Sequence, residues 1–180
     1  MQLLERSEIK FKPGSKFQYC NSNYILLALL CEKMYKTNFQ AILQKQIFTP
    51  LQMDNSFLFT SYSPEIIKGY SKTNLQPIEY NWYTYGDGGI NASLQDMQKW
   101  STFLLSQNSY WHDIMNPPAE FRKFNYSWGW MLDENIYHLG GDPGFGSLIL
   151  VQPKNDKSLI MLSNLNDSWK LMREIAKAKS

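Results

Sequence analysis

The sequence has few cysteines, no long apolar run and little net charge. It has 180 residues, two of them cysteine, only 19% are charged, and 18 Lys and Arg nearly balance 16 Asp and Glu. The net charge of +2 is spread along the chain, so we expect no nucleic-acid partner. The longest apolar run, residues 24–31, is far shorter than the roughly 20 residues needed to cross a bilayer, so we expect no membrane span.

Cysteine and histidine are too sparse to suggest a disulfide or a metal site. Cys20 and Cys31 flank a segment that we expect to be helical, where a rise of about 1.5 Å per residue holds them roughly 16 Å apart. A disulfide needs Cα atoms closer than about 7 Å. His112 and His138 are far apart in the sequence and have no paired cysteines, so we expect no metal and no cofactor.

The abundant residues are apolar, 43%, and aromatic, 15%, as in a folded domain. The order of patterns predicts an α+β fold in a single domain over 1–180, an antiparallel sheet flanked by helices. We expect a helix and loop region over about 11–125, and antiparallel strands with a C-terminal helix over about 126–180.

Three helices are expected in the first region. Residues 21–34 start with capping side chains, Asn21-Ser22-Asn23, and are apolar on nearly every side, which predicts a helix buried all round. A second helix should cover 39–47. A third should start after Ser93 as N-cap, with Asp96 three residues later in a capping-box arrangement. Between them, residues 54–90 predict long loops with short extended pieces.

Two hairpins are expected in the second region. Residues 128–132 and 136–138 flank one turn signal, and 147–151 and 158–162 flank another. The strands are apolar on successive residues, so helices should cover both faces of the sheet. A helix around Trp169 should be one of them, because it carries an apolar stripe.

Four short signatures follow one another in a suggestive order. Each alone has an ordinary explanation: a Tyr-x-Asn is most often a helix cap beside a core aromatic, and a glycine cluster is most often a turn. The signatures are Phe11 to Asn21, Ile47 to Met53, Gly86 to Gly89, and His138 to Phe145. Together they resemble the serine β-lactamase and penicillin-binding-protein superfamily, in particular its class C β-lactamase-like branch.

The resemblance implies acyl transfer on a small molecule or peptide with an ester, amide or β-lactam carbonyl. It makes Tyr19 the proton shuttle for a serine nucleophile, its phenol kept partly ionised by a neighbouring positive charge, because an unperturbed tyrosine pKa near 10 is too high for a base. Asn21 would hold the substrate amide, and His138 would face Tyr19 or a substrate carboxylate. Gly140 and Gly141 would let the substrate lie against a strand, with the Gly141 N–H as an oxyanion donor.

The sequence departs from the family pattern in two ways. Leu139 stands where the family has threonine, which weakens the case for β-lactam hydrolysis. In addition, the family's Ser-x-x-Lys lies several tens of residues before its Tyr-x-Asn, but only 18 residues precede Tyr19 here. The one Ser-x-x-Lys, Ser7 to Lys10, precedes a turn and not a helix, so we do not expect it to be the nucleophile. We expect Cys20 to be a small buried thiol.

We therefore expect the C-terminal part of a β-lactamase-like fold, inactive alone, with the nucleophile segment missing. The alternative is a non-catalytic remnant or binding module that keeps the substrate groove. Exposed sheet surface would favour self-association or a complementing N-terminal segment. We expect no signal peptide in this chain, and the family suggests the cell envelope or secretion if such a segment is missing.

Overall fold

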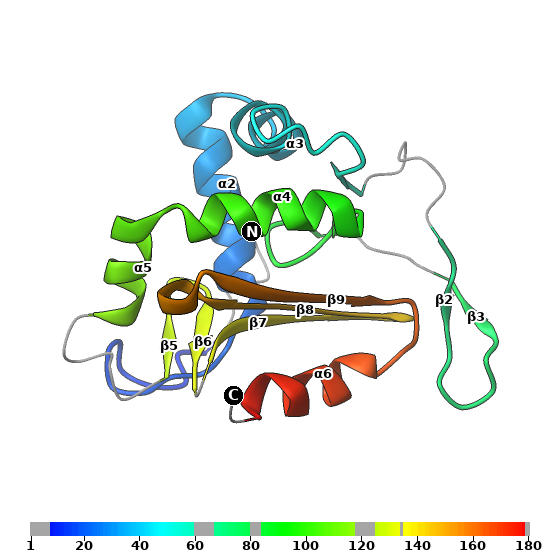
Figure 1. The fold of residues 1–180 in the computed structure, drawn as a ribbon. Coiled ribbons are helices and arrows are strands. Elements are labelled where there is room, and N and C mark those ends of the chain that lie inside the picture. The colour runs from blue at the N-terminus through cyan, green and yellow to red at the C-terminus, as the bar shows by residue number, and fades with distance from the viewer. Residues whose placement is uncertain (1–7, 60–66, 80–83, 118–124, 134, 179–180) are drawn as a thin grey trace.

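A computed structural model describes residues 8–59, 67–79, 84–117, 125–133 and 135–178 of the chain. Its centre is a five-stranded antiparallel sheet in the order β5-β6-β7-β8-β9. One helix crosses each face of the sheet, and the other helices lie to one side of it (Figure 1). This arrangement confirms the α+β fold. The sheet comprises β5 (Tyr126–Ser127), β6 (Trp130–Leu132), β7 (Ile136–Asp142), β8 (Phe145–Gln152) and β9 (Lys157–Ser163).

The three long strands are joined by tight turns. β7 pairs with β8 from Ile136↔Val151 to Asp142↔Phe145, and β8 pairs with β9 over seven residue pairs. The turn between β7 and β8 needs Gly144, whose φ is +84°, a backbone conformation that favours glycine. This third hairpin was not expected, because its glycine-rich turn coincides with a signature that we interpreted as a functional motif.

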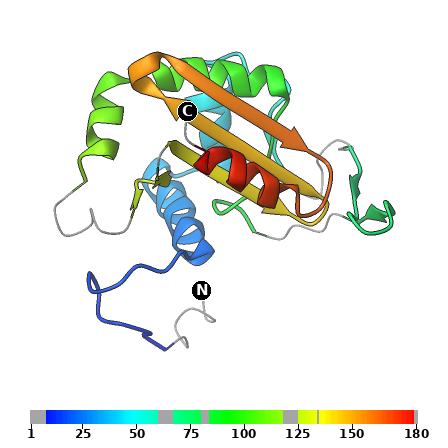
Figure 2. The ribbon, with the colours of Figure 1, turned by 60° about the horizontal axis from the view of Figure 1, so that its bottom comes forward.

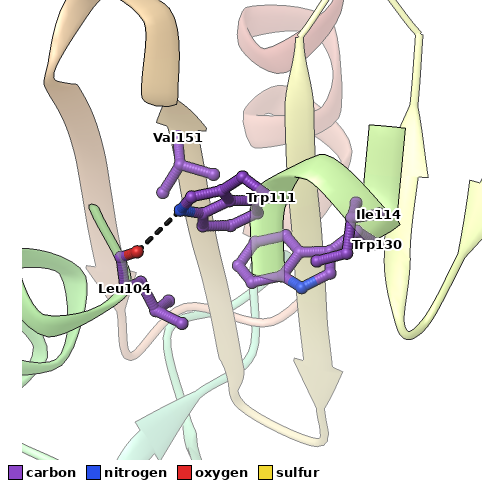
Figure 3. Close-up of a cluster of buried hydrophobic side chains, with 5 residues drawn as sticks. All are labelled: Leu104, Trp111, Ile114, Trp130 and Val151. Carbon is purple, nitrogen blue, oxygen red and sulfur yellow. Dashed lines mark hydrogen bonds between the residues drawn. The ribbon is translucent and has the colours of Figure 1, made fainter. Parts of the chain in front are cut away.

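The helices α4 (Leu94–Leu105) and α6 (Ser168–Lys177) cover opposite faces of the sheet, as expected. On the α4 side, side chains from α4, from α5 (Asn108–Met115) and from the sheet form a buried cluster, in which Trp111 Nε1 donates a hydrogen bond of 2.6 Å to the Leu104 carbonyl (Figure 3). On the α6 side, Tyr137, Leu148 and Met172 are at the centre of a second cluster. The sequence did not predict α5.

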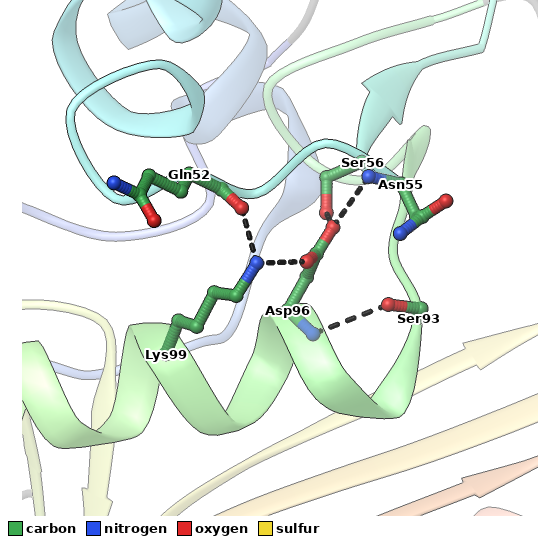
Figure 4. Close-up of polar contacts among 6 residues, drawn as sticks. All are labelled: Gln52, Asn55, Ser56, Ser93, Asp96 and Lys99. Atoms are coloured by element: carbon green, nitrogen blue, oxygen red, sulfur yellow. Dashed lines mark hydrogen bonds and ion pairs between the residues drawn. The ribbon is translucent and has the colours of Figure 1, made fainter.

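The start of α4 was predicted in part. Ser93 is its N-cap, and its hydroxyl accepts a hydrogen bond of 3.1 Å from the Asp96 N–H. The Asp96 carboxylate does not close a capping box, however. It is fully buried and accepts hydrogen bonds from the Asn55 N–H, at 2.8 Å, and the Ser56 hydroxyl, at 2.9 Å, while Lys99 Nζ lies 3.2 Å away (Figure 4). Asp96 therefore ties α4 to the loop that follows the second helical segment.

Helix α2 (Asn21–Tyr35) contradicts the expectation of burial all round. Ala28 is its one buried residue, while its opposite face carries an apolar stripe, which we define as Leu26, Leu27, Leu30 and Met34, with exposed fractions from 41% to 70%. The four residues fall on one side of a helix with 3.6 residues per turn. The helix packs on one face only, because no described element covers the stripe. Its N-cap is Cys20, without a side-chain cap, so the predicted asparagine caps were wrong.

The remaining elements follow the predicted order. The second helix is α3 (Phe39–Leu43), capped by Asn38 and continued by a π-helical turn, η1 (Gln44–Phe48). Within the described parts of 54–90 the chain forms loops and two-residue strands, as expected: β1 (Phe57–Leu58), β2 (Gly69–Tyr70), β3 (Pro77–Ile78) and β4 (Ile90–Asn91). Among the helices that the structure describes, none is long and apolar enough to cross a membrane.

Candidate active site

The first part of the site is the segment that enters α2. Tyr19 lies just before the N-cap and is exposed, and Asn21 is the first residue of the helix. The loop with Gly86 packs against this helix. A Cβ at Gly86 would lie 2.6 Å from the Tyr24 carbonyl oxygen and 2.7 Å from the Ala28 Cβ, so only glycine allows this approach. The close contact holds the glycine loop beside the residues that begin α2.

The second part is the C-terminal half of β7. Strand β6 pairs with β7 only at Ile136 and Tyr137, so residues 138–141 pair with β8 but with no described strand on the other side. The two glycines admit neighbouring side chains. A Cβ at Gly140 would lie 2.2 Å from the Ser147 hydroxyl, and a Cβ at Gly141 would lie 2.8 Å from Trp169 Cδ1. Because Gly140 and Gly141 have no side chains, an extended ligand could approach the backbone of β7 closely along this edge.

These two parts meet at one cavity. The ring centroids of Tyr19 and His138 are 6.4 Å apart, and a cavity of about 860 Å³ is lined by both. Its walls also include Asn21, Gly140 and Gly141, so all five predicted site residues are brought together. Three of the four signatures contribute, because Gly86 to Gly89 line the cavity as well. The fourth, Ile47 to Met53, belongs to a separate buried cluster with Leu43 and Leu58.

An aromatic cluster forms the wall behind Tyr19, and the sequence did not predict it. The Tyr126 ring lies 6.0 Å from that of Tyr19, edge on, and 5.1 Å from that of Phe17. The hydroxyls of Tyr24 and Tyr126 are hydrogen-bonded to each other. Tyr24 lies on α2 and Tyr126 on β5, and no sequence spacing relates two residues so far apart. The cluster fixes the position of α2 relative to the sheet.

The electrostatics keep both central rings neutral near pH 7. Partial burial raises the pKa of Tyr19 above 10.0, and Tyr24 and the Asp87 carboxylate raise it further. Burial lowers the pKa of His138 below 6.5, although a backbone hydrogen bond at Leu139 acts in the opposite direction. No described cation is among the groups that shift Tyr19. Arg173 and Lys177 line the same cavity, but neither is among the groups that shift the pKa of Tyr19.

The nucleophile is not evident either. Ser147 lines the cavity, but its hydroxyl lies against Gly140 on the neighbouring strand. Ser7, of the one Ser-x-x-Lys, lies outside the described residues. Cys20 is exposed at the N-cap position of α2, so the expectation of a buried thiol was wrong. Within the described ranges no three His, Cys, Asp or Glu side chains gather to hold a metal ion.

Comparison with known proteins decides the family. A sequence profile of the beta-lactamase family matches residues 1–179. The chain belongs to the beta-lactamase family. Among curated members, Protein flp of Staphylococcus aureus strain MW2 is 26% identical over 90% of this chain, and penicillin-binding protein 4* of Bacillus subtilis strain 168 is 26% identical over 93%. The chain spans only 36% and 44% of their lengths.

Solved structures share the fold. A penicillin-binding protein from Bacillus halodurans superposes with a TM-score of 0.75 at 21% identity, over 95% of this chain and 58% of its own. A class C β-lactamase superposes with a TM-score of 0.74 at 17% identity, over 97% of this chain and 59% of its own. This beta-lactamase-family chain therefore has the fold of the matching part of both structures. Its membership supports a function of the serine-hydrolase kind.

Proposed function

We propose that this chain forms the Tyr-x-Asn and strand-edge half of a serine acyl-hydrolase site, which acts on a peptide, ester or β-lactam carbonyl. The observation that carries the proposal is the convergence of Tyr19, Asn21 and His138 on one cavity beside the unpaired edge of β7. In this proposal Asn21 holds the substrate amide, and the strand edge at Gly140 and Gly141 binds its backbone. The Gly141 N–H is the oxyanion donor.

In the same proposal the serine comes from a Ser-x-x-Lys segment outside this chain. A serine hydroxyl needs a base beside it before it can attack a carbonyl. Tyr19 serves as that base only when its pKa is lowered, and a lysine from the same segment would lower it by its charge. The raised pKa of Tyr19 here supports this division of roles, since burial and Asp87 leave the phenol protonated at neutral pH.

Binding tests the groove directly. The ¹⁵N-labelled chain is titrated in turn with N-acetyl-D-Ala-D-Ala, a neutral ester of it, and a penicillin. We expect amide shifts confined to Gly86 to Gly89 and to residues 138–141, the segments that line the cavity. Asn21→Ala should weaken binding about tenfold, the loss expected for a hydrogen bond to a substrate amide. The control is Asn23→Ala, an exposed position on the same helix. Absence of shifts at these amides with all three ligands would refute the proposed groove.

The alternative function is a binding module without catalysis, favoured because Ser147, the described serine that lines the cavity, has its hydroxyl against Gly140. Intact-mass spectrometry after incubation with the penicillin separates the two. The chain alone should gain no covalent adduct under either proposal. A mixture with a Ser-x-x-Lys segment should gain one only if the chain is half of a hydrolase, and a penicilloyl adduct on the chain alone would show that a serine within it is competent.

A further inference from the structure

The cavity beside β7 carries charged side chains on two opposite sides of the unpaired edge of that strand. Asp87 lies on the side of Tyr19, and Arg173 and Lys177 lie on the side of α6. Within the described parts of the chain, none of these three charged side chains forms an ion pair. Their charges are therefore available to a ligand in the cavity.

The acidic side is the wall formed by the glycine loop and the segment before α2. The Asp87 carboxylate is half-buried, and it accepts a hydrogen bond of 3.1 Å from the Thr84 hydroxyl of the same loop. Besides burial, this carboxylate raises the pKa of Tyr19, so the two groups belong to one wall. His138 faces the same side, because its partner on β8, Ile149, packs against the cluster on the α4 side.

The basic side is a flank of α6, the red helix in Figure 2, which lies over β7 and β8. Trp169, Arg173 and Lys177 are four residues apart, so they fall on one flank of the helix, and all three line the cavity. Met172, one position before Arg173, is buried against the sheet instead. A Cβ at Gly141 would lie 2.8 Å from Trp169 Cδ1, so the flank begins directly beside the unpaired edge.

One carboxylate on the α6 side offsets part of the positive charge. Asp133 lines the cavity and accepts a hydrogen bond of 2.8 Å from the Tyr137 hydroxyl. Burial and this bond raise the pKa of Tyr137, while the Arg173 guanidinium acts in the opposite direction. Glu174, the next residue of α6, is exposed and is not among the residues that line the cavity. Two cations, Arg173 and Lys177, against one carboxylate leave this wall net positive.

A peptide that adds to the edge of β7 reaches both walls. Residues 138–141 pair with no described strand on this side, and an extended peptide can bind such an edge as a further strand. Successive side chains of an extended peptide point to opposite sides. One side chain therefore faces Asp87, and the next one faces the flank of α6.

We propose that this site selects an extended peptide in which a basic residue stands next to an acidic one, with the basic side chain at Asp87 and the acidic side chain at Arg173 and Lys177. The inference rests on the proposed acyl-hydrolase function, because it specifies the ligand of the same groove. The preference is electrostatic, so it should weaken as added salt screens the charges.

Peptides that differ only in the order of their residues test the preference. The ¹⁵N-labelled chain is titrated with acetyl-Ala-Lys-Glu-Ala-Ala-amide, with acetyl-Ala-Glu-Lys-Ala-Ala-amide, and with acetyl-Ala-Lys-Ala-Glu-Ala-amide. In the last peptide both charges point to the same side, so it cannot complement both walls. The better of the two peptides with adjacent charges should bind at least about threefold more tightly than the spaced one, the effect of one partly exposed ion pair. Acetyl-penta-alanine-amide measures binding without charge.

Variants assign each charge to its wall. Asp87→Asn should remove the advantage that a lysine side chain gives over alanine. Arg173→Gln combined with Lys177→Gln should remove the advantage of glutamate. The matched controls are Asp113→Asn and Lys170→Gln, which are exposed and lie outside the cavity, and they should change neither preference. Circular dichroism checks that each variant stays folded.

Two different failures can be told apart. Equal binding of the adjacent and spaced peptides, or a charge preference that survives the cavity variants, would overturn this inference. Amide shifts at 86–89 and 138–141 with the uncharged peptide would in that case still support the proposed groove. Absence of these shifts with every peptide would refute the groove itself, and the charge preference with it.

Discussion

The phenol ring of Tyr19 and the imidazole ring of His138 lie 6.4 Å apart across the cavity, one from the segment before α2 and the other from β7. Neither ring carries a charge near pH 7, because burial raises the pKa of the phenol and lowers that of the imidazole. In the proposed hydrolase Tyr19 is the proton shuttle, so a positive charge would be needed beside it to lower its pKa.

The pKa of His138 should lie below 6.5, because the partial burial of its ring disfavours the charged form. The measurement is the imidazole ¹H–¹³C signal between pH 4 and 8, with His112→Gln leaving one histidine. The sign for stability follows from linkage. As pH falls below 6.5 the unfolded chain binds a proton that the folded chain does not, so stability falls with pH. His138→Gln should remove that part of the pH dependence, and a midpoint above 6.5 would contradict the burial argument.

Tyr24→Phe should lower the free energy of unfolding by about 1 kcal/mol, the usual net value of a hydrogen bond. The Tyr126 hydroxyl, part-buried, loses its partner in this variant. Its pKa, raised by burial and by the bond to Tyr24, should fall toward the ordinary tyrosine value where water replaces that bond. Urea denaturation and ultraviolet titration measure the two effects. Tyr35→Phe, at an exposed position of the same helix, is the control and should change neither.

Gly86→Ala and Gly14→Ala form a matched pair, since both glycines have positive φ, +96° and +77°. Nothing lies within 4 Å of a Cβ at Gly14, so its substitution should cost only the backbone strain, about 1 kcal/mol. At Gly86 the Cβ also meets the Tyr24 carbonyl and Ala28, which brings the expected loss to about 3 kcal/mol. Equal losses for the two variants would show that the glycine loop does not need its close approach to α2.

Asp96→Asn should destabilise the fold by about 2 kcal/mol, because hydrogen bonds to a charged group are worth more than neutral ones. Burial acts to raise the pKa of Asp96, but the bonds from Ser56, Asn55 and Lys99 outweigh it and lower the pKa below 3.8. The contribution is therefore present above the ordinary carboxylate pKa and is lost as pH falls through the lowered value.

Lys99→Met is the comparison for this network, since the amine is part-exposed and its ion pair contributes less. Its melting temperature should fall less than that of Asp96→Asn. If the lysine variant were the less stable of the two, the ion pair, and not the bonds to Ser56 and Asn55, would be what ties α4 to its loop.

Local signals predicted much of the fold. The cap at Ser93, the hairpin around residues 133–135, and the apolar runs of β8 and β9 each depend on neighbours within a few residues, so sequence spacing was enough. The β7–β8 hairpin was missed because its turn is made of glycines that also suit a ligand edge. Helix α5 was missed because its main partner, Trp130, is distant in the sequence.

The sequence predicted which residues form the candidate site, but not which side chains and charges surround them. Tyr19, Asn21 and His138 were found by resemblance, and their meeting at one cavity is a tertiary fact. The tyrosine cluster, the Asp87 charge and the indole of Trp169 against Gly141 arise from long-range packing that no local pattern encodes. The burial of α2 was predicted wrongly for the same reason. Its apolar sequence suggested burial on every side, but which sides are buried depends on contacts with segments that are distant in the sequence.

The unpaired edge of β7 also determines which side chains of this chain would contact each residue of an extended ligand. Along an extended chain, successive side chains point to opposite sides. At this edge one side is the wall of Tyr19 and His138, and the other is the wall of Trp169 and α6. Neighbouring residues of one ligand would thus be selected by two unrelated sets of side chains, so substitutions at Trp169 and at Tyr19 would alter preference at alternate positions of the same peptide.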